Sequence, residues 1–133
     1  MTATRTPVNP WSWSLGYGFN QAELVESASR LLVLSGQGPA AADGTPQYAG
    51  DLPAQVSLCL DNIETVLTDA GMTLRNVVRI NVFTTDVDAM MGSWGELAKR
   101  FALAGVQPTS TLVGVTRLAF PEMMVEIEAT AVD

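Results

Sequence analysis

The side chains that could do acid–base chemistry in this chain of 133 residues are carboxylates and hydroxyls, because the sequence holds no histidine and one cysteine, Cys59. The absence of histidine removes the commonest general base, the commonest zinc ligand and any Ser-His or Cys-His nucleophilic pair. A single cysteine allows no internal disulfide and no cysteine cluster around a metal. The sequence therefore predicts no metal site, and we expect Cys59, which falls in a helical apolar stripe, in the core.

Two glutamates belong to the segment 124–132, in which apolar and polar residues alternate. The apolar residues of this predicted strand are Val125, Ile127, Ala129 and Ala131, and the polar ones are Glu126, Glu128 and Thr130. Successive side chains of a strand point to opposite faces, so Glu126 and Glu128 share the polar face. A carboxylate there could exchange a proton with water or with a substrate nitrogen. The alternative is a solvated surface carboxylate.

Ser35, at the end of the predicted strand 30–35 and just before Gly36, also has two possible roles. Its hydroxyl could bind a ligand, or the residue could form a turn.

Composition limits the partners. Seven basic residues against fourteen acidic ones give a formal charge of −7, which repels a phosphate backbone, so no nucleic-acid partner is predicted. The apolar runs are far shorter than the roughly 20 residues of a transmembrane helix, and the first residues lack the apolar stretch of a secretory signal. We therefore expect no membrane partner and a cytoplasmic location.

The elements that must position these groups follow from the spacing of apolar residues, within one predicted domain, 1–133, whose first 18 residues form an irregular arm. Strands are expected at 19–26 and 30–35, joined as a β-hairpin, and at 77–84, 109–117 and 124–132. One helix is capped by Asp51 and ends before Gly71, and a second begins at Asp86 or Asp88 and ends at Gly105. The order ββαβαββ predicts an α+β fold with one sheet and both helices on a single face. The other face then needs a cover, which self-association would supply.

Several short pieces of the sequence occur together in a particular order and spacing. They are Phe19-Asn20-Gln21-Ala22, Leu34-Ser35-Gly36-Gln37, Ala54-Gln55, Leu60-Asp61-Asn62, Ala70-Gly71-Met72, Val77 to Phe83 with Asp86, Val115-Thr116-Arg117-Leu118, and Val125 to Ala129. Taken together, the chain resembles the reactive intermediate deaminase family, also called RidA or YjgF. The resemblance implies a chorismate-mutase-like fold, a homotrimer whose sheets form a central barrel, and small-molecule clefts between subunits. Active members hydrolyse enamines and imines to carbonyl products and ammonia without a metal or organic cofactor.

The resemblance also implies roles for individual residues. Glu126 falls at the glutamate that is associated with the attacking water. Ser110, in Pro108-Thr109-Ser110-Thr111, falls where active members carry the arginine that holds the substrate carboxylate. A hydroxyl cannot supply that bidentate, charge-assisted pairing, so we expect altered specificity. Glu126 and Ser110 are the predicted catalytic residues.

The remaining predicted cleft residues make the pocket less polar than the family pattern. Phe19 replaces a tyrosine, and Trp94 replaces an asparagine. The predicted substrate-binding residues are Phe19, Ser35, Thr111, Leu112 and Trp94. Such a pocket, with one of the N-terminal indoles near it, would suit a neutral or partly aromatic ligand.

Three functions are compatible with these residues. The first is hydrolytic deamination of an imine or enamine by Glu126, with a water held by Ser110 or Thr111. The alternative is a catalytically silent trimer that binds a metabolite or has a regulatory role, which the missing arginine favours. RNA cleavage, for which some relatives are named, is the third function and ranks last. The chain has no histidine for acid–base catalysis, and its charge of −7 repels RNA.

Overall fold

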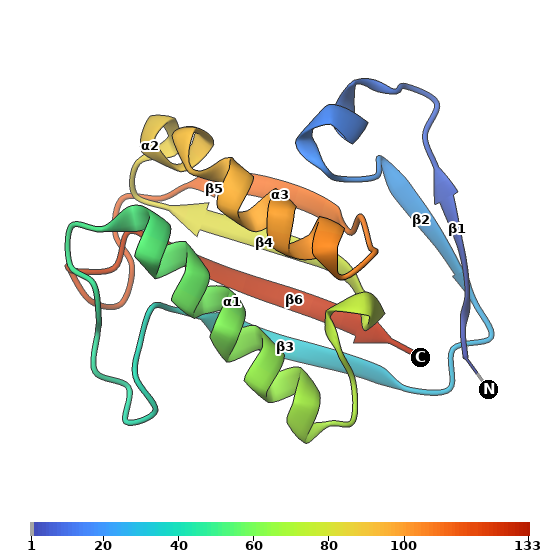
Figure 1. Ribbon diagram of the computed structural model, residues 1–133, viewed down its shortest axis with the longest axis horizontal. Coiled ribbons are helices and arrows are strands. Elements are labelled where there is room, and N and C mark those ends of the chain that lie inside the picture. Colours follow the sequence, from blue (N-terminus) through green and yellow to red (C-terminus); the bar gives the residue numbers. More distant parts are fainter. Residues whose placement is uncertain (1) are drawn as a thin grey trace.

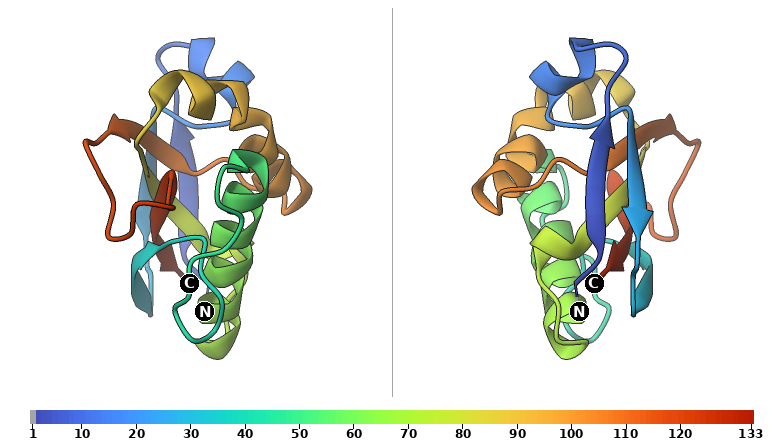
Figure 2. Two further views of the ribbon diagram at one scale, coloured as in Figure 1. Left: turned by 90° about the vertical axis from the view of Figure 1, so that its left-hand side faces the viewer. Right: turned by 90° about the vertical axis from the view of Figure 1, so that its right-hand side faces the viewer.

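The computed structural model describes residues 2–133 and contains two groups of strands with the helices on one side (Figure 1). The elements are β1 (Thr4–Val8), the 3-10 helix η1 (Trp13–Tyr17), β2 (Ala22–Glu26), β3 (Leu31–Gln37), α1 (Leu52–Asp69), the 3-10 helix η2 (Leu74–Asn76), β4 (Val77–Thr84), α2 (Val87–Gly92), α3 (Trp94–Leu103), β5 (Thr109–Gly114) and β6 (Val125–Val132). The predicted α+β class is confirmed, and the two ends of the described chain lie close together (Figure 2).

The main sheet has four strands in the order β3-β6-β4-β5. Its central strands β4 and β6 are antiparallel, whereas β5 runs parallel to β4. Ile80 on β4 is in register with Ala129 on β6 and with Ser110 on β5, so these three residues share one face of the sheet. This register fixes which side chains of β5 face the helices.

The alternation predicted for the last strand is present in β6. Val125, Ile127 and Ala129 are buried, and the residues between them are only partly buried. The buried face packs against α1, which begins where the Asp51 carboxylate accepts a hydrogen bond from the Ala54 backbone N–H, 3.1 Å away. Asp51 thus caps the helix as predicted.

The first strands pair differently from the predicted hairpin. β2 pairs with β1 in an antiparallel ribbon, whereas β3 pairs with β6, so the expected β2–β3 hairpin is wrong. The residues before β3 are hydrogen-bonded to the C-terminus, with the Ser29 N–H donating to the Asp133 carbonyl at 2.7 Å. Those bonds hold the start of β3 against the end of β6. β2 therefore pairs with a strand other than β3. The segment expected to be an irregular arm supplies it as β1.

The ribbon of β1 and β2 is anchored by Arg5. Its guanidinium forms an ion pair with Glu23 of β2 and donates to the Val77 carbonyl at 2.8 Å. Beyond the ribbon, Asn20 bridges to Thr109 at the start of β5. The strands thus form a four-stranded sheet and a separate two-stranded ribbon, in place of the single sheet that was expected.

The second predicted helix is divided in two at Ser93, which ends α2 and precedes α3. The Asp86 carboxylate caps α2 by accepting from the Ala89 N–H at 3.0 Å. Met90 is fully buried beneath this corner, whereas Met91 is exposed. The corner therefore turns Met91 away from the core.

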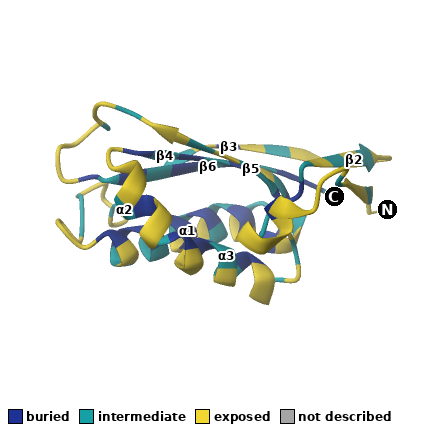
Figure 3. Ribbon diagram, turned by 90° about the horizontal axis from the view of Figure 1, so that it is seen from above, coloured by how far each residue is buried: buried dark blue, intermediate teal, exposed yellow. Residues whose placement is uncertain are grey.

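The sheet face opposite the helices is not covered by any of residues 2–133 (Figure 3). Leu31 and Val33 of β3 leave 66% and 71% of their surface exposed. Val33 is in register with Thr130 of β6, which belongs to the same face as Glu126 and Glu128. We call this surface the open face. Contiguous exposed apolar side chains of this kind are typical of interaction surfaces.

Candidate functional site

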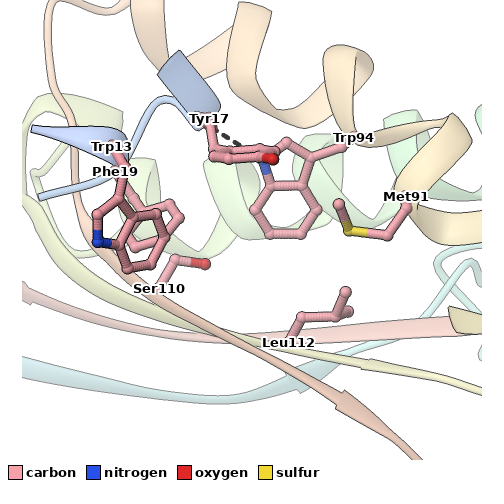
Figure 4. A pocket seen from close by; sticks show the side chains of 7 residues that line it. All are labelled: Trp13, Tyr17, Phe19, Met91, Trp94, Ser110 and Leu112. Carbon is pink, nitrogen blue, oxygen red and sulfur yellow. Dashed lines mark hydrogen bonds between the residues drawn. The ribbon is translucent and has the colours of Figure 1, made fainter. Parts of the chain in front are cut away.

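A pocket of about 270 Å³ opens between η1, the α2–α3 corner and β5 (Figure 4). The residues that line it are Trp13, Tyr17, Phe19, Met91, Trp94, Ser110 and Leu112. Ser110 and Leu112 reach it from the helix-facing side of β5, because they are in register with the buried residues Ile80 and Val82. The pocket therefore lies at the end of the helix layer, where α3 leaves β5 uncovered.

Two contacts hold the aromatic wall of this pocket. The Trp94 indole N–H donates to the Tyr17 backbone carbonyl at 2.8 Å, which ties α3 to η1 (Figure 4). The rings of Trp13 and Phe19 meet edge to face, with centroids 5.9 Å apart and planes at 83°. Edge-to-face packing is a favourable geometry for aromatic pairs. The rings are therefore positioned before any ligand arrives.

Ser110 supplies the inward-facing polar atom of the pocket. Its hydroxyl oxygen is buried and has no hydrogen-bond partner among residues 2–133. The side chain points from β5 toward the space between the aromatic rings (Figure 4). A buried hydroxyl without a partner is destabilising, and a ligand that hydrogen-bonds to it would remove that penalty.

No charged side chain is among the residues that line the pocket of the described chain. Ser110 is the position at which the sequence resemblance predicted the loss of an arginine, and the lining contains no arginine or lysine. A carboxylate bound in this pocket would therefore have no cationic partner among the described lining residues.

Glu126 lies on the opposite side of the sheet from Ser110. It is in register with Phe83 on β4 and alternates with the buried residues Val125 and Ile127, so its side chain belongs to the open face. The neighbouring Glu128 accepts a hydrogen bond from the Asn81 side-chain amide at 2.9 Å. Within one chain, therefore, the two predicted catalytic residues do not meet.

The structure brings four of the predicted site residues together and leaves three elsewhere. Phe19, Trp94, Ser110 and Leu112 line the pocket. Ser35 is exposed on β3, and Thr111 is exposed on the open face, in register with Asn81. Because neighbouring residues of a strand face opposite sides, Thr111 cannot share the pocket with Ser110 and Leu112.

Two pocket residues were not predicted as ligand contacts. Met91 belongs to α2, the first part of the second predicted helix. Its position three residues before Trp94 is the spacing of neighbours on one helical side and is the signal that pairs them. Tyr17 stands between Gly16 and Gly18 and has no sequence signal of its own, because only the η1 fold brings it to Trp94.

The described residues contain no group of three His, Cys, Asp or Glu side chains that could hold a metal ion. No helix within residues 2–133 has the length and apolar character needed to cross a membrane.

The four-stranded sheet, the helices on one face and the pocket beside β5 define a small α+β protein of the chorismate-mutase-like RidA fold. The chain belongs to the RidA/YjgF family, since the family model described as Endoribonuclease L-PSP matches residues 18–133.

Individual relatives agree with this assignment. The crystal structure of YyfB from Yersinia pestis, a Rid family protein of unknown function, superposes with a TM-score of 0.88 at 31% identity and covers 97% of this chain and 98% of that one. The crystal structure of Escherichia coli TdcF with bound serine gives a TM-score of 0.69 at 29% identity, covering 79% of this chain and 82% of that chain. TdcF carries the name of a reactive intermediate deaminase.

A shorter match is found with the mitochondrial protein mmf1 of Schizosaccharomyces pombe. It is 35% identical over 86 residues, which are 65% of this chain and 50% of mmf1. The match thus spans about half the length of that relative.

Proposed function

We propose that this protein hydrolyses imines or enamines to carbonyl products and ammonia in clefts between the subunits of a homotrimer, with a specificity altered by Ser110. Family membership and the name of TdcF support the reaction class. We retain the predicted cytoplasmic location and the absence of a cofactor as part of this proposal.

The observation that carries the proposal is the placement of Ser110 and Glu126 on opposite faces of one sheet. A site that uses both must take Ser110 from one subunit and Glu126 from another. The open face, with Leu31 and Val33 exposed beside the glutamates, supplies the apolar surface that such an association would bury. Each subunit would then contribute a pocket at one cleft and a carboxylate at the next.

In this cleft Glu126 acts as the proton shuttle. Its carboxylate accepts a proton from water as the water oxygen bonds to the imine carbon, and the imine nitrogen gains a proton. The hydroxyl proton of the resulting carbinolamine then passes to its nitrogen by way of Glu126, the C–N bond breaks, ammonia leaves, and the carbon retains the oxygen as a carbonyl. The sum is one imine and one water giving one carbonyl compound and one ammonia. Ser110 hydrogen-bonds to the reacting group and helps to position it.

The direct test measures ammonia released from freshly generated imines. Glu126→Gln removes the proton acceptor with little change in size, and we expect it to lower the rate by about 10²–10⁴-fold. The matched control is Glu96→Gln, which changes an exposed glutamate of α3 outside the pocket. Equal turnover by wild type and Glu126→Gln would show that Glu126 is not the proton shuttle.

Mixing subunits tests whether the site is shared. Ser110→Tyr fills the pocket and Glu126→Gln removes the carboxylate, so each variant alone should be inactive. Trimers assembled from both would contain some clefts with an intact Ser110 and an intact Glu126. We expect partial activity in the mixture. A mixture that is as inactive as its components would mean that Ser110 and Glu126 act within one subunit, or that they lie outside the site.

A second candidate is a catalytically silent trimer that binds a metabolite or has a regulatory role. The uncharged lining of the pocket favours it, because the family's clamp for the substrate carboxylate is missing. Absence of turnover in the wild type, together with activity gained by Ser110→Arg, would support this candidate. RNA cleavage remains the least favoured, given the charge of −7 and the absence of histidine.

A further inference from the structure

The pocket beside Ser110 carries information about the ligand beyond the reaction class. Trp13, Tyr17, Phe19 and Trp94 provide four aromatic rings, and Met91 and Leu112 complete an apolar wall. Trp13 and Tyr17 are 60% and 48% exposed, so a ligand seated between the rings would cover apolar surface that now faces water. Covering aromatic surface is a large favourable contribution to binding.

The hydrogen-bonding groups of the pocket limit the polar part of the ligand. The Trp94 indole N–H is already bonded to the Tyr17 carbonyl, whereas the Ser110 hydroxyl is buried and unpartnered. One polar atom on the ligand, such as an imine nitrogen or a carbonyl oxygen, would satisfy that hydroxyl. The Tyr17 hydroxyl and the Trp13 indole N–H also belong to the lining, but both are on exposed side chains, so Ser110 is the buried partner that a ligand would satisfy.

A carboxylate in particular does not fit this lining. Moving an ionised carboxylate from water into an apolar site is costly unless a cation or several donors receive it. The lining contains no arginine or lysine, and the net charge of −7 gives an overall field that opposes an anion. The pocket thus selects against the carboxylate of an amino-acid-derived imine.

The volume indicates the size of the ligand. About 270 Å³ is slightly below the roughly 300–1,000 Å³ found for small-molecule pockets. A single ring with a short arm fits such a space better than a fused or extended molecule. The aromatic walls favour a flat, apolar ring.

We propose that the ligand of this pocket is an imine, or its carbonyl product, that carries one apolar ring on a short arm and no carboxylate. The inference rests on the proposed function for the imine and on the pocket itself for the ring and the missing acid. The ring lies among Trp13, Phe19 and Trp94, and the C=N or C=O group is hydrogen-bonded to Ser110.

A binding experiment tests the ligand class without requiring turnover. Phenylacetone and phenylpyruvate have the same ring, arm and ketone, but phenylpyruvate has a carboxylate in place of the methyl group. By isothermal titration calorimetry we expect wild-type protein to bind phenylacetone at least tenfold more tightly. Tighter binding of phenylpyruvate, equal binding, or binding of neither compound would overturn the inference.

Variants assign that preference to the pocket. Ser110→Arg should reverse it by adding a cation at the pocket wall, whereas Thr116→Arg adds the same charge at an exposed position beyond β5 and should leave it unchanged. Trp13→Ala should weaken phenylacetone binding at least fivefold, and the exposed position of Trp13 makes misfolding a small risk. If Ser110→Arg kept the wild-type preference for phenylacetone, the ligand would bind outside this pocket.

A kinetic comparison separates this inference from the proposed function. Flavin oxidases acting on 2-phenylethylamine and on phenylalanine generate imines that differ by one carboxylate, and released ammonia is measured for each. We expect a rate enhancement at least tenfold larger for the imine from 2-phenylethylamine. A preference for the phenylalanine imine would retain the function and reject the ligand class. Phenylacetone binding without turnover of either imine would retain the ligand class and reject the function.

Discussion

Gly36 of β3 lies directly against the side chain of Glu126 of β6. A Cβ atom placed on Gly36 would come within 2.9 Å of Glu126 Cγ and 2.7 Å of its Cδ, closer than side chains pack in folded proteins. Because glycine has a hydrogen in place of a Cβ atom, Gly36 leaves space for the Glu126 carboxylate on the open face. Position 36 controls where the proposed proton shuttle can lie.

Gly36→Ala should therefore lower the rate of ammonia release strongly and the free energy of unfolding moderately. The methyl group displaces the Glu126 side chain, and we expect ammonia release to fall by about tenfold or more while the free energy of unfolding falls by about 1–3 kcal/mol. Gly95→Ala is the control, because a Cβ there meets nothing within 4 Å. It should preserve turnover and stabilise α3 by about 0.5–1 kcal/mol. Full activity in Gly36→Ala would contradict the positioning role.

Trp94→Phe should loosen the aromatic wall. Phenylalanine keeps a ring but cannot donate to the Tyr17 carbonyl, and we expect a loss of about 1–3 kcal/mol in the free energy of unfolding, measured with urea. Backbone amides of η1 should exchange with deuterium faster in the variant. Trp11→Phe, at a residue 61% exposed and outside the pocket, is the matched control and should change neither measurement. Equal exchange in the two variants would mean that Trp94 does not hold η1.

The elements with local signals could be predicted from the sequence. Asp51 has a side chain suited to a helix start, and the run 77–84 is dense in β-branched residues, so α1 and β4 follow from short-range chemistry. The partner of β2 could not be predicted in this way. β1 contains Pro7 and shows no apolar alternation, and its position depends on Arg5 reaching Glu23 and Val77 far along the chain.

The candidate site was also predicted in part, because its residues have local signals and their arrangement does not. Ser110 and Glu126 are identified by local sequence patterns, but their placement on opposite faces depends on the register of β4 with its two neighbours. A shift of one residue would reverse the face of every side chain in β5, and nothing in the isolated strand sequence excludes that shift. Tyr17 reaches the pocket through the fold of η1, which the bond from Trp94 to its backbone carbonyl ties to α3.

Cys59 should make the protein less stable at high pH. Burial, with a smaller contribution from the Glu126 charge, raises the pKa of the Cys59 thiol to about 12, whereas an unfolded thiol titrates near about 8.5. Between these values the unfolded state loses a proton that the native state keeps, so stability falls as pH rises. The loss is at most about 1.4 kcal/mol per pH unit.

The measurement is the free energy of unfolding of wild type and Cys59→Ala between pH 8.5 and 11. The alanine variant is expected to start lower, because it leaves a small cavity, but to show the shallower pH slope. The native wild-type thiol should also resist alkylation at pH 8 until the protein is unfolded. Parallel slopes for the two proteins would show that the thiol does not stay protonated in the native state.

Val33→Glu should prevent assembly of the proposed trimer. Val33 is 71% exposed on the open face in the isolated chain, and a glutamate there would add a buried charge near Glu128 if subunits associate through this face. Arg79 lies in the same row, across Thr130, but removing a charged pair from water can cost more than its attraction returns, and a penalty of several kcal/mol would separate subunits at micromolar concentration. Leu103→Glu is the matched control, because Leu103 at the end of α3 is 78% exposed and lies on the helix side. Sedimentation should give trimers for the wild type and Leu103→Glu and smaller species for Val33→Glu. A trimeric Val33→Glu protein would place the interface elsewhere and remove the basis for a cleft shared between subunits.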